Sequence, residues 1–408
     1  MHGKWVTRSM KSLVKNIPQI LIKGMGCVVI AVLFCLKPFC SIKIGNIYFH
    51  RLGHLALNTD LFLRRLQSGE IPDKHFYIFI SGKPCNQQLL KMFKIHLRIV
   101  ENDFLFKMWQ ICLPLFQKTA FFQDLPMRSN EYPVYQDSHK VLTFTPEEEL
   151  RGQSYLRKLG IGEKDWFVSL FVRDNAYLST MFPEKDWRYH DSRNADIDSY
   201  TAACQYISQQ GGYVIRLGSV VQKKIDLGDP KIIDYSVSED QCAFLDIYLS
   251  AKARFHLGTT SGMSDVAIIF DVPRIGTNFM PVGHIPWGKT NVYIPKIIRQ
   301  KETQKIIPYR FFLKDKRERE YLNSWKFAEQ NISPENNSSE DILDVTQEMM
   351  ARLDGTFEFS DADRELLDKY FQLFEPGNWS YGIGTPIGLK FLKKYPEMFS
   401  YELELKNA

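Results

Sequence analysis

The chain has 408 residues, 44% hydrophobic and 24% charged, which are proportions of a folded protein with one large or two ordinary domains. This composition excludes a disordered chain and a polytopic membrane protein. The net charge of +5 is uneven, because residues 1–59 carry eight Lys or Arg and no acid, which leaves −3 for the rest. A basic patch at one end beside apolar sequence favours an anionic membrane surface over nucleic acid.

The apolar part of this N-terminal segment is short. Gly24 to Leu36 is uncharged, but its 13 residues are fewer than the ~20 that span a bilayer. A basic stretch precedes it, as in a signal peptide, yet no small-residue cleavage site follows. We expect residues 1–40 to form an interfacial helix with its basic side chains at the headgroups. A short transmembrane anchor and a buried helix are the alternatives.

The next segments alternate between strand and helix, which predicts a parallel sheet in an N-terminal domain over residues 41–150. The expected strands and helices are Ile42–Phe49, Asn58–Gln67, His75–Ile80 and Asn86–His96. Residues 118–150 look irregular until Thr145, which we expect to cap a helix that begins at Pro146.

A second alternation predicts a doubly wound domain over residues 151–315. Its expected strands are Trp166–Val172, Tyr213–Leu217, Ile232–Tyr235, Arg254–Leu257 and, as the last clear strand, Pro273–Thr277. Its expected helices are Ile197–Gln209, Cys242–Ser250 and one from about Ser264. Residues 316–408 form a C-terminal helical region with helices at Asp341–Leu353 and Asp361–Phe374.

The first loop with candidate chemistry follows the strand at 42–49. Arg51 suits a phosphate or carboxylate, Gly53 lets a ligand approach the backbone, and His54 suits a base near neutral pH. Asn58 lies one turn further on. The alternative is a tight strand–helix turn in which the histidine is simply exposed.

Two polar loops are expected in the C-terminal domain before its second strand. Arg173 leaves the end of a central strand and should point into a ligand cleft, or else form a surface pair with Asp174. Arg193, Asn194 and Asp196 precede a helix. Asp196 is a candidate acid/base or sugar-binding group, although helix capping explains the pattern better on spacing alone.

Two further features predict an anion site. Arg216 ends an apolar strand, where an unpaired charge is costly, so it needs either an internal carboxylate or a donor diphosphate. The second feature is a hydroxyl-rich turn that opens a helix, where N–H groups and the helix dipole favour a phosphate. That turn comprises Gly258, Thr259, Thr260, Ser261 and Gly262, with Asp265 in the following helix. A capping turn is the alternative.

The sequence lacks the motifs of several other enzyme classes and of disulfide or zinc sites. The seven cysteines are odd in number and none has CxxC spacing, so neither a disulfide framework nor a zinc site is expected. Neither GxxxxGK[ST] nor GxGxxG is present, which argues against an NTPase and a dinucleotide oxidoreductase. The GxSxG and HExxH motifs of hydrolases are also absent.

Taken in order, these stretches resemble a family of bacterial glycosyltransferases from surface-polysaccharide and glycosylation genes. The matching stretches are IGNIYFHRLGHLALNTDLFLRR, FVRDNAYL, RNADIDSY, YVIRLGSVV, IIDYS, FLDIYLSAKARFHLGTTSGMSD, the helix with SEDILDVTQEM, and IGLKFLKKYPEMF. The resemblance implies a GT-B-like α/β fold, with two Rossmann-like doubly wound domains facing a central cleft and a nucleotide-sugar donor in the C-terminal half.

On this basis we expect a metal-independent glycosyltransferase without a cofactor, at the cytoplasmic face of the bacterial inner membrane. Its partners would be a nucleotide sugar, a glycan, lipid-linked or protein acceptor, and the membrane surface, but no nucleic acid. Arg173, Arg216 and the turn 258–262 would hold the donor diphosphate, and His54, or second Asp196, would deprotonate the acceptor. The alternatives are a non-catalytic carbohydrate- or nucleotide-binding scaffold and an epimerase or dehydrogenase acting on a nucleotide sugar.

Overall fold

The computed structural model describes residues 3–127, 131–181 and 183–400, and for residues 3–17 and Met181 it describes the backbone alone. The basic side chains expected at Lys4, Arg8, Lys11 and Lys15 therefore lie outside the described part. The chain divides into two compact units, residues 1–127 and 128–408.

The N-terminal unit is built on a parallel sheet. Its strands β1 (Ile42–Asn46), β2 (Phe76–Ser81) and β3 (Arg98–Glu101) pair in the order β1-β2-β3. The helices are α1 (Gly3–Leu36), α2 (Leu52–Gln67), α3 (Gln87–His96) and α4 (Asp103–Phe116). The expected strand–helix alternation is confirmed here, with β3 and α4 as additions.

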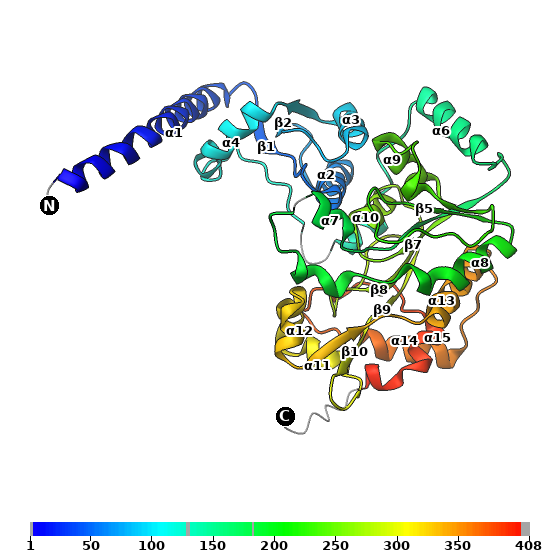
Figure 1. Cartoon of the computed structure of the whole chain (residues 1–408). Coiled ribbons are helices and arrows are strands. Elements are labelled where there is room, and N and C mark those ends of the chain that lie inside the picture. The colour runs from blue at the N-terminus through cyan, green and yellow to red at the C-terminus, as the bar shows by residue number, and fades with distance from the viewer. Residues whose placement is uncertain (1–2, 128–130, 182, 401–408) are drawn as a thin grey trace. The chain divides into compact units, whose positions relative to one another are not determined.

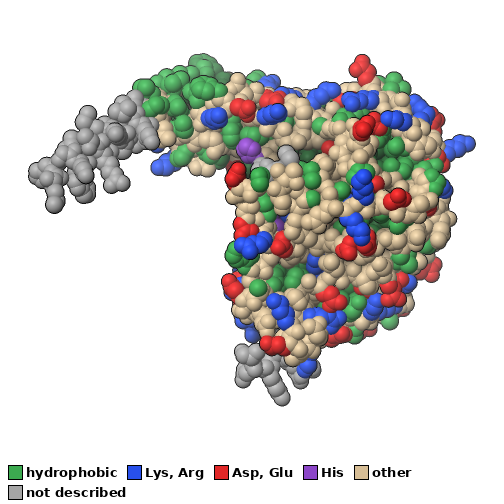
Figure 2. All heavy atoms as spheres, in the orientation of Figure 1, with side chains coloured by type: hydrophobic (Ala, Val, Ile, Leu, Met, Phe, Trp, Pro, Cys, Tyr) green, Lys and Arg blue, Asp and Glu red, His purple; other side chains and the backbone are tan. Residues whose placement is uncertain are grey.

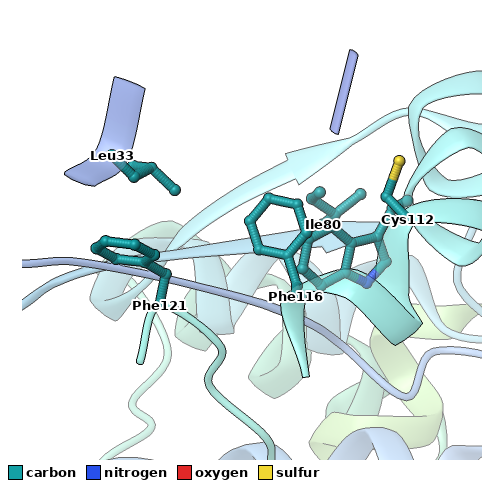
Figure 3. Packing of buried hydrophobic residues seen from close by; sticks show 6 residues of the cluster. Leu33, Ile80, Cys112, Phe116 and Phe121 are labelled. Atoms are coloured by element: carbon teal, nitrogen blue, oxygen red, sulfur yellow. The ribbon is translucent and has the colours of Figure 1, made fainter. Parts of the chain in front are cut away.

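A compact apolar cluster holds α1 and α4 to this sheet. Leu33 of α1, Ile80 of β2 and Phe116 of α4 are members of it (Figure 3). Cys112, Phe121 and the α4 residue Trp109 complete the buried set. α4 is further fixed to the sheet because the indole of Trp109 donates to Asn46 Oδ1 at 3.1 Å.

The C-terminal unit is a doubly wound domain on a six-stranded parallel sheet with the order β6-β5-β4-β7-β8-β9. The strands are β4 (Phe167–Phe171), β5 (Tyr213–Arg216), β6 (Ile232–Asp234), β7 (Phe255–Gly258), β8 (Arg274–Phe279) and β9 (Asn291–Pro295). A separate antiparallel pair joins β10 (Ile297–Gln300) to β11 (Ile332–Glu335). The five expected strands are present, but Pro273–Thr277 is not the last, since β9, β10 and β11 follow it.

Helices surround this sheet (Figure 1). The α-helices are α5 (Tyr132–Asp137), α6 (Pro146–Lys158), α7 (Ala176–Met181), α8 (Thr201–Gln209), α9 (Ala243–Lys252), α10 (Gly262–Ile269), α11 (Tyr309–Leu313), α12 (Trp325–Glu329), α13 (Ser339–Leu353), α14 (Asp361–Phe371) and α15 (Leu389–Lys394). The 3₁₀ helices are η1 (Arg188–Arg193), η2 (Ile197–Tyr200), η3 (Tyr235–Val237), η4 (Lys314–Leu322) and η5 (Pro396–Phe399).

The boundaries of the units differ from the predicted domain limits. Residues 131–150 belong to the C-terminal unit, because the ring of Phe144 stacks on that of Phe270 at 5.6 Å. The C-terminal helices are part of the same unit rather than a separate region. The reason is that α13 packs on α8 and β9, burying Ile342 and Met349.

Local signals explain several helix starts. Thr145 caps α6 as expected, and a capping box joins its side chain to the backbone N–H of Glu148. Ser338 and Ser360 form the same kind of box at α13 and α14. The α/β class, the parallel sheets and the N-terminal apolar helix are thus all present as expected.

Candidate functional site

The loops after three adjacent strands meet at the carboxyl edge of the large sheet. β4 lies between β5 and β7, with Leu170 opposite Arg216 and Phe171 opposite Gly258. The chain leaves β4 for β5 on one side and returns to β7 on the other, which is the reversal of strand order where ligands bind in open α/β sheets. The loops are joined directly, because the backbone N–H of Arg173 donates to Thr259 Oγ1 at 2.9 Å.

A pocket of about 420 Å³ lies at this edge. It is lined by Val172, Asp174, Asn175, Asn194, Ala195, Asp196, Ile197, Arg216, Gln222, Lys223 and Asn336. The lining is rich in amides and carboxylates, which are groups that bind hydroxyls and ring nitrogens. Of the predicted residues it contains Asn194, Asp196 and Arg216, whereas the turn 258–262 is outside it.

Arg173 lies beside the pocket wall. Its Nε donates to Asn194 Oδ1 at 3.3 Å, and its carbonyl oxygen accepts from Ala195 N at 3.0 Å. Asn194 Nδ2 in turn donates to Asn175 Oδ1 at 2.5 Å. The guanidinium therefore orients an amide that lines the pocket. Asp174 accepts from the backbone N–H of Gln222 at 2.8 Å.

Arg216 has its charge partner inside the protein. Its Nη1 lies 3.2 Å from Asp234 Oδ2 and donates to the carbonyl oxygen of Lys223 at 2.5 Å. Of the two partners expected for this arginine, the structure supplies the internal carboxylate. Asp234 Oδ2 also accepts from Ile225 N at 2.8 Å, so this pair fixes the loop that bears Lys223.

The hydroxyls of the turn 258–262 are engaged within the fold. Thr259 holds Arg173 N, and Thr260 Oγ1 accepts from Met280 N at 3.4 Å. Ser261 caps α10 in a reciprocal pair with Ser264. Gly258 is required by close packing, since a side chain there would overlap the backbone of Phe171. This is the capping-turn geometry; Gly262, the first residue of α10, is half-buried.

Asp196 and Asp198 serve different contacts. The side chain of Asp196 caps η2 by accepting from Asp198 N at 3.1 Å, and the residue is exposed at the pocket. Asp198 forms an ion pair with Lys223 instead. The two carboxylates therefore do not form a metal-binding pair, and no group of three His, Cys, Asp or Glu suited to a metal occurs among the described residues.

Asp265 and Arg193 belong to a neighbouring buried region around α10. Burial raises the pKa of Asp265 to about 6, and the positive charges of Arg274 and Arg193 oppose that rise. Arg274 is itself buried and donates to Ser264 Oγ at 3.3 Å.

The predicted acceptor-side residues lie at the start of α2 in the N-terminal unit. Arg51 is the N-cap residue, and Gly53 and His54 are in the first turn. His54 is exposed, and its Nδ1 lies 3.3 Å from Asn58 Oδ1. Asn58 is buried and donates to Leu125 O at 2.5 Å. Asn58 therefore fixes the start of α2 to the segment at Leu125 and orients the imidazole of His54.

Lys296 is a functional candidate that the sequence analysis missed. It follows β9, is 3% exposed, and donates from Nζ to Asn194 O and Asn336 Oδ1, each at 2.6 Å. Both partners line the pocket. Within the described residues no carboxylate lies within 4.0 Å of this ammonium, and burial lowers its pKa to about 8. The residues on either side of it, Ile294 and Pro295 before and Ile297 and Ile298 after, are apolar, which is the one sequence signal for a buried lysine.

No protein-family model matches this chain, and no curated protein sequence matches it. Among solved structures it is similar to a glycosyl transferase family 9 protein from Veillonella parvula, at 10% identity and a TM-score of 0.40 over 63% of this chain and 86% of that one. It is also similar to E. coli ADP-heptose lps heptosyltransferase II, at 12% identity and a TM-score of 0.39 over 62% and 90% of the two chains. At TM-scores below 0.5 this likeness carries no argument for what the present chain does.

Proposed function

We propose that this protein is a glycosyltransferase. It moves a sugar from a nucleotide-sugar donor to a glycan, lipid-linked or protein acceptor in bacterial surface-glycan synthesis. The observation that carries the proposal is the buried ammonium of Lys296 behind the polar pocket at the carboxyl edge of the large sheet. The stretches that resemble bacterial glycosyltransferases include the loops at 172–175 and 193–198 that line this pocket.

A buried ammonium without a carboxylate partner is costly to keep in a folded protein. Lys296 has two carbonyl oxygens as partners, which satisfy hydrogen bonds but leave its positive charge uncompensated. An anionic ligand in the adjoining pocket would compensate that charge. The diphosphate of a nucleotide sugar is such a ligand, and Arg173, which orients Asn194, adds a second positive charge at the same wall.

The rest of the pocket suits the uncharged parts of the donor. Asn175, Asn194 and Asn336 present amides, and Asp174 and Asp196 present carboxylates. Amides and carboxylates bind sugar hydroxyls and the edges of a nucleobase through directional hydrogen bonds. The positive charges of Lys296 and Arg173 would lie near the diphosphate. The amides and carboxylates of the pocket would face the sugar hydroxyls and the nucleobase.

The proposed reaction needs no metal or cofactor. The acceptor oxygen forms a bond to the anomeric carbon, the bond from that carbon to the diphosphate oxygen breaks, and the acceptor proton passes to a base. His54 is the proposed base, and Asp196 the second candidate. The departing diphosphate gains negative charge, which Lys296 and Arg173 would stabilise, because preorganised positive charge lowers the barrier most where charge develops.

The test is a thermal-shift screen of the full chain against UDP-, GDP-, ADP-, CMP- and dTDP-sugars, followed by calorimetry with the nucleotide sugar that stabilises the protein. A ligand at about 100 times its Kd raises the free energy of unfolding by ~2.7 kcal/mol. The Lys296→Met variant should bind that donor about ten- to a hundredfold more weakly, since a charge is lost from a poorly solvated site.

The matched control is Lys224→Met, which removes an exposed lysine that does not line the pocket. It should leave donor affinity unchanged. Equal donor affinity in the wild type and in Lys296→Met, with both variants folded, would exclude this pocket as the donor site. Stabilisation by no nucleotide sugar at all would argue against a transferase that uses one.

A further inference from the structure

In the part of α1 whose side chains the structure describes, Pro18 to Leu36, the helix contacts the rest of its unit along a narrow stripe. Ile22, Gly26, Ile30 and Leu33 face inward at helical spacing. The approach to α4 is close, because a side-chain carbon at Gly26 would lie 2.8 Å from the Sγ of Cys112, whose thiol also donates to Ile22 O at 3.3 Å. α1 therefore lies along α4 over more than two turns instead of projecting away from it.

Between Pro18 and Leu36, where the structure describes the side chains, the remaining surface of α1 is exposed and, apart from Lys23, almost entirely apolar. Pro18 to Leu36 has a mean hydropathy of 2.3 over 19 residues, and 11% of that window is buried. Figure 2 shows the hydrophobic side chains gathered along this helix. The large exposed apolar residues of α1 and the turn after it are Ile20, Leu21, Met25, Val28, Val29, Val32, Phe34, Leu36 and Phe39.

α4 adds a second exposed apolar face. Its inner side buries Trp109, Cys112 and Phe116, yet Phe104 is 72% exposed, and Met108, Ile111 and Leu115 are only partly covered. These four residues follow one another at intervals of four, three and four, which places them along one side of a helix. Leu115 also touches α1, since its Cδ1 would lie 3.7 Å from a side-chain carbon at Gly26. The exposed apolar residues of α1 and the partly exposed apolar side of α4 thus adjoin near Gly26, beside the exposed polar stripe of Asp103, Lys107 and Gln110.

The charge beside this surface identifies its partner. Exposed apolar surface of this extent marks a binding face in a soluble domain. Lys23 and Lys37 on α1 and its end, and Lys107 and Lys118 on and after α4, are exposed at its margins. The first acid of the chain is Asp60. Broad apolar surface with basic margins fits a bilayer that contains anionic lipids.

We propose that the outer faces of α1 and α4 dock together into the headgroup–acyl boundary of an anionic bilayer, with both helices along the membrane surface. If α1 crossed the bilayer, α4 would also have to enter the hydrocarbon region, because the segment from Ile22 to Leu33 packs on α4. α4 carries Asp103 and Lys107 and is fixed to the sheet through Trp109 and Asn46. Charged groups and a sheet edge are not tolerated in the hydrocarbon, so α1 docks as a monotopic helix. This inference is independent of the proposed transfer reaction.

The first experiment is co-sedimentation of the full chain with vesicles of phosphatidylcholine alone or of an equal mixture with phosphatidylglycerol. Strong binding to the mixed vesicles, weakened by salt and by removal of phosphatidylglycerol, is expected. Phe104→Glu should lower the membrane partition coefficient about tenfold, because it replaces an aromatic ring that inserts into the lipid by a charged side chain. Leu150→Glu on α6, a residue 64% exposed, is the matched control and should bind as the wild type does.

The second experiment measures how deeply α1 and α4 insert into the bilayer. Spin labels are attached to Val28→Cys or Phe104→Cys, with the exposed Cys27, Cys35, Cys40 and Cys85 replaced by serine, and the exposure of each label to oxygen and to a water-soluble relaxant is compared. Both labels should lie at a similar shallow depth. A label at 28 near the bilayer centre with a label at 104 in water would overturn the proposal in favour of a spanning anchor. Failure to bind either vesicle would overturn it in favour of a protein partner.

Discussion

Arg216 Nη1 lies 3.2 Å from Asp234 Oδ2, and the two side chains are only 2% and 8% exposed. The pair lies at the ends of neighbouring strands, because Arg216 is the residue opposite Asp234 in the register of β5 and β6. Its charges compensate each other within the sheet. Arg216 therefore shapes the pocket wall, whereas Lys296 supplies a buried positive charge behind it that is held by two carbonyl oxygens.

The Arg216→Met variant should lose about 3–5 kcal/mol of unfolding free energy, because it leaves Asp234 buried without its partner. Urea denaturation followed by circular dichroism measures this loss. Arg188→Met, which removes an exposed partner of Asp186, should change the midpoint little. Equal midpoints for the two variants would show that the buried pair does not stabilise the fold.

Donor affinity should depend on pH through Lys296. Burial lowers its pKa to about 8, so the ammonium is present at pH 7 and is lost as the pH rises above 8. Calorimetric affinity for the nucleotide sugar should therefore fall between pH 7 and pH 9 in the wild type. In Lys296→Met the affinity should already be low and should change little over this range. A parallel decline in both proteins would assign the pH dependence to another group.

Thr259→Val should destabilise the junction between the loops after β4 and β7. The side chain of Thr259 is 1% exposed, and its hydroxyl is the acceptor for the backbone N–H of Arg173. Valine keeps the shape but leaves that N–H without its acceptor, at a cost of ~1–3 kcal/mol. Thr259→Ser retains the hydroxyl and should recover the hydrogen-bonding part of the loss. Denaturation of the three proteins under one condition compares them directly.

His256 should make the protein sensitive to acid. Its ring is buried beside Ser169 Oγ, 2.9 Å from Nδ1, and burial lowers its pKa to about 3. The unfolded chain, with an ordinary pKa near 6.5, binds more protons between these values, so stability falls as the pH drops from 6.5 towards 3. The slope from this one residue approaches ~1.4 kcal/mol per pH unit.

The check on this acid sensitivity is the slope in a His256→Gln variant. Glutamine does not titrate, so the variant should lose stability less steeply on acidification, whatever its stability at pH 7. His284, whose pKa is also lowered to about 3, would continue to contribute in both proteins. Identical slopes in the two proteins would contradict the role assigned to His256.

Short-range patterns predicted much of the fold. The stretch Trp166–Val172 predicted β4 within one residue at each end, and Thr145 predicted the cap of α6, because both depend on neighbouring residues alone. α4 was not predicted, although Asp103, Lys107 and Gln110 of DFLFKMWQICLPLF recur at helical spacing along its exposed side. Apolar residues outnumber this polar stripe, because the helix buries one side in the unit and leaves a second apolar side only partly covered.

The site was harder to predict than the strands. Arg173 and Thr259 were expected to face one phosphate site, which stays a prediction; the carboxyl ends of neighbouring parallel strands join their loops through the backbone N–H of Arg173, while its guanidinium contacts Asn194. The partner of Arg216 was left open between an internal acid and a ligand, and only the pairing of β5 with β6 decided it. Lys296 depends on contacts with residues 102 and 40 positions away along the chain, which no local pattern reveals.

Leu33 packs against Ile80, Phe116 and Phe121, and this packing has a practical consequence for purification. Removal of residues 1–36 to improve solubility would remove the contacts that α1 makes with the N-terminal core. The rings of Phe116 and Phe121 would then be exposed to solvent, which favours aggregation. A cut just before Pro18 would keep the stripe from Ile22 to Leu33 in place. Detergent or lipid is then needed for the outer face alone, and the catalytic assays can proceed on an intact N-terminal unit.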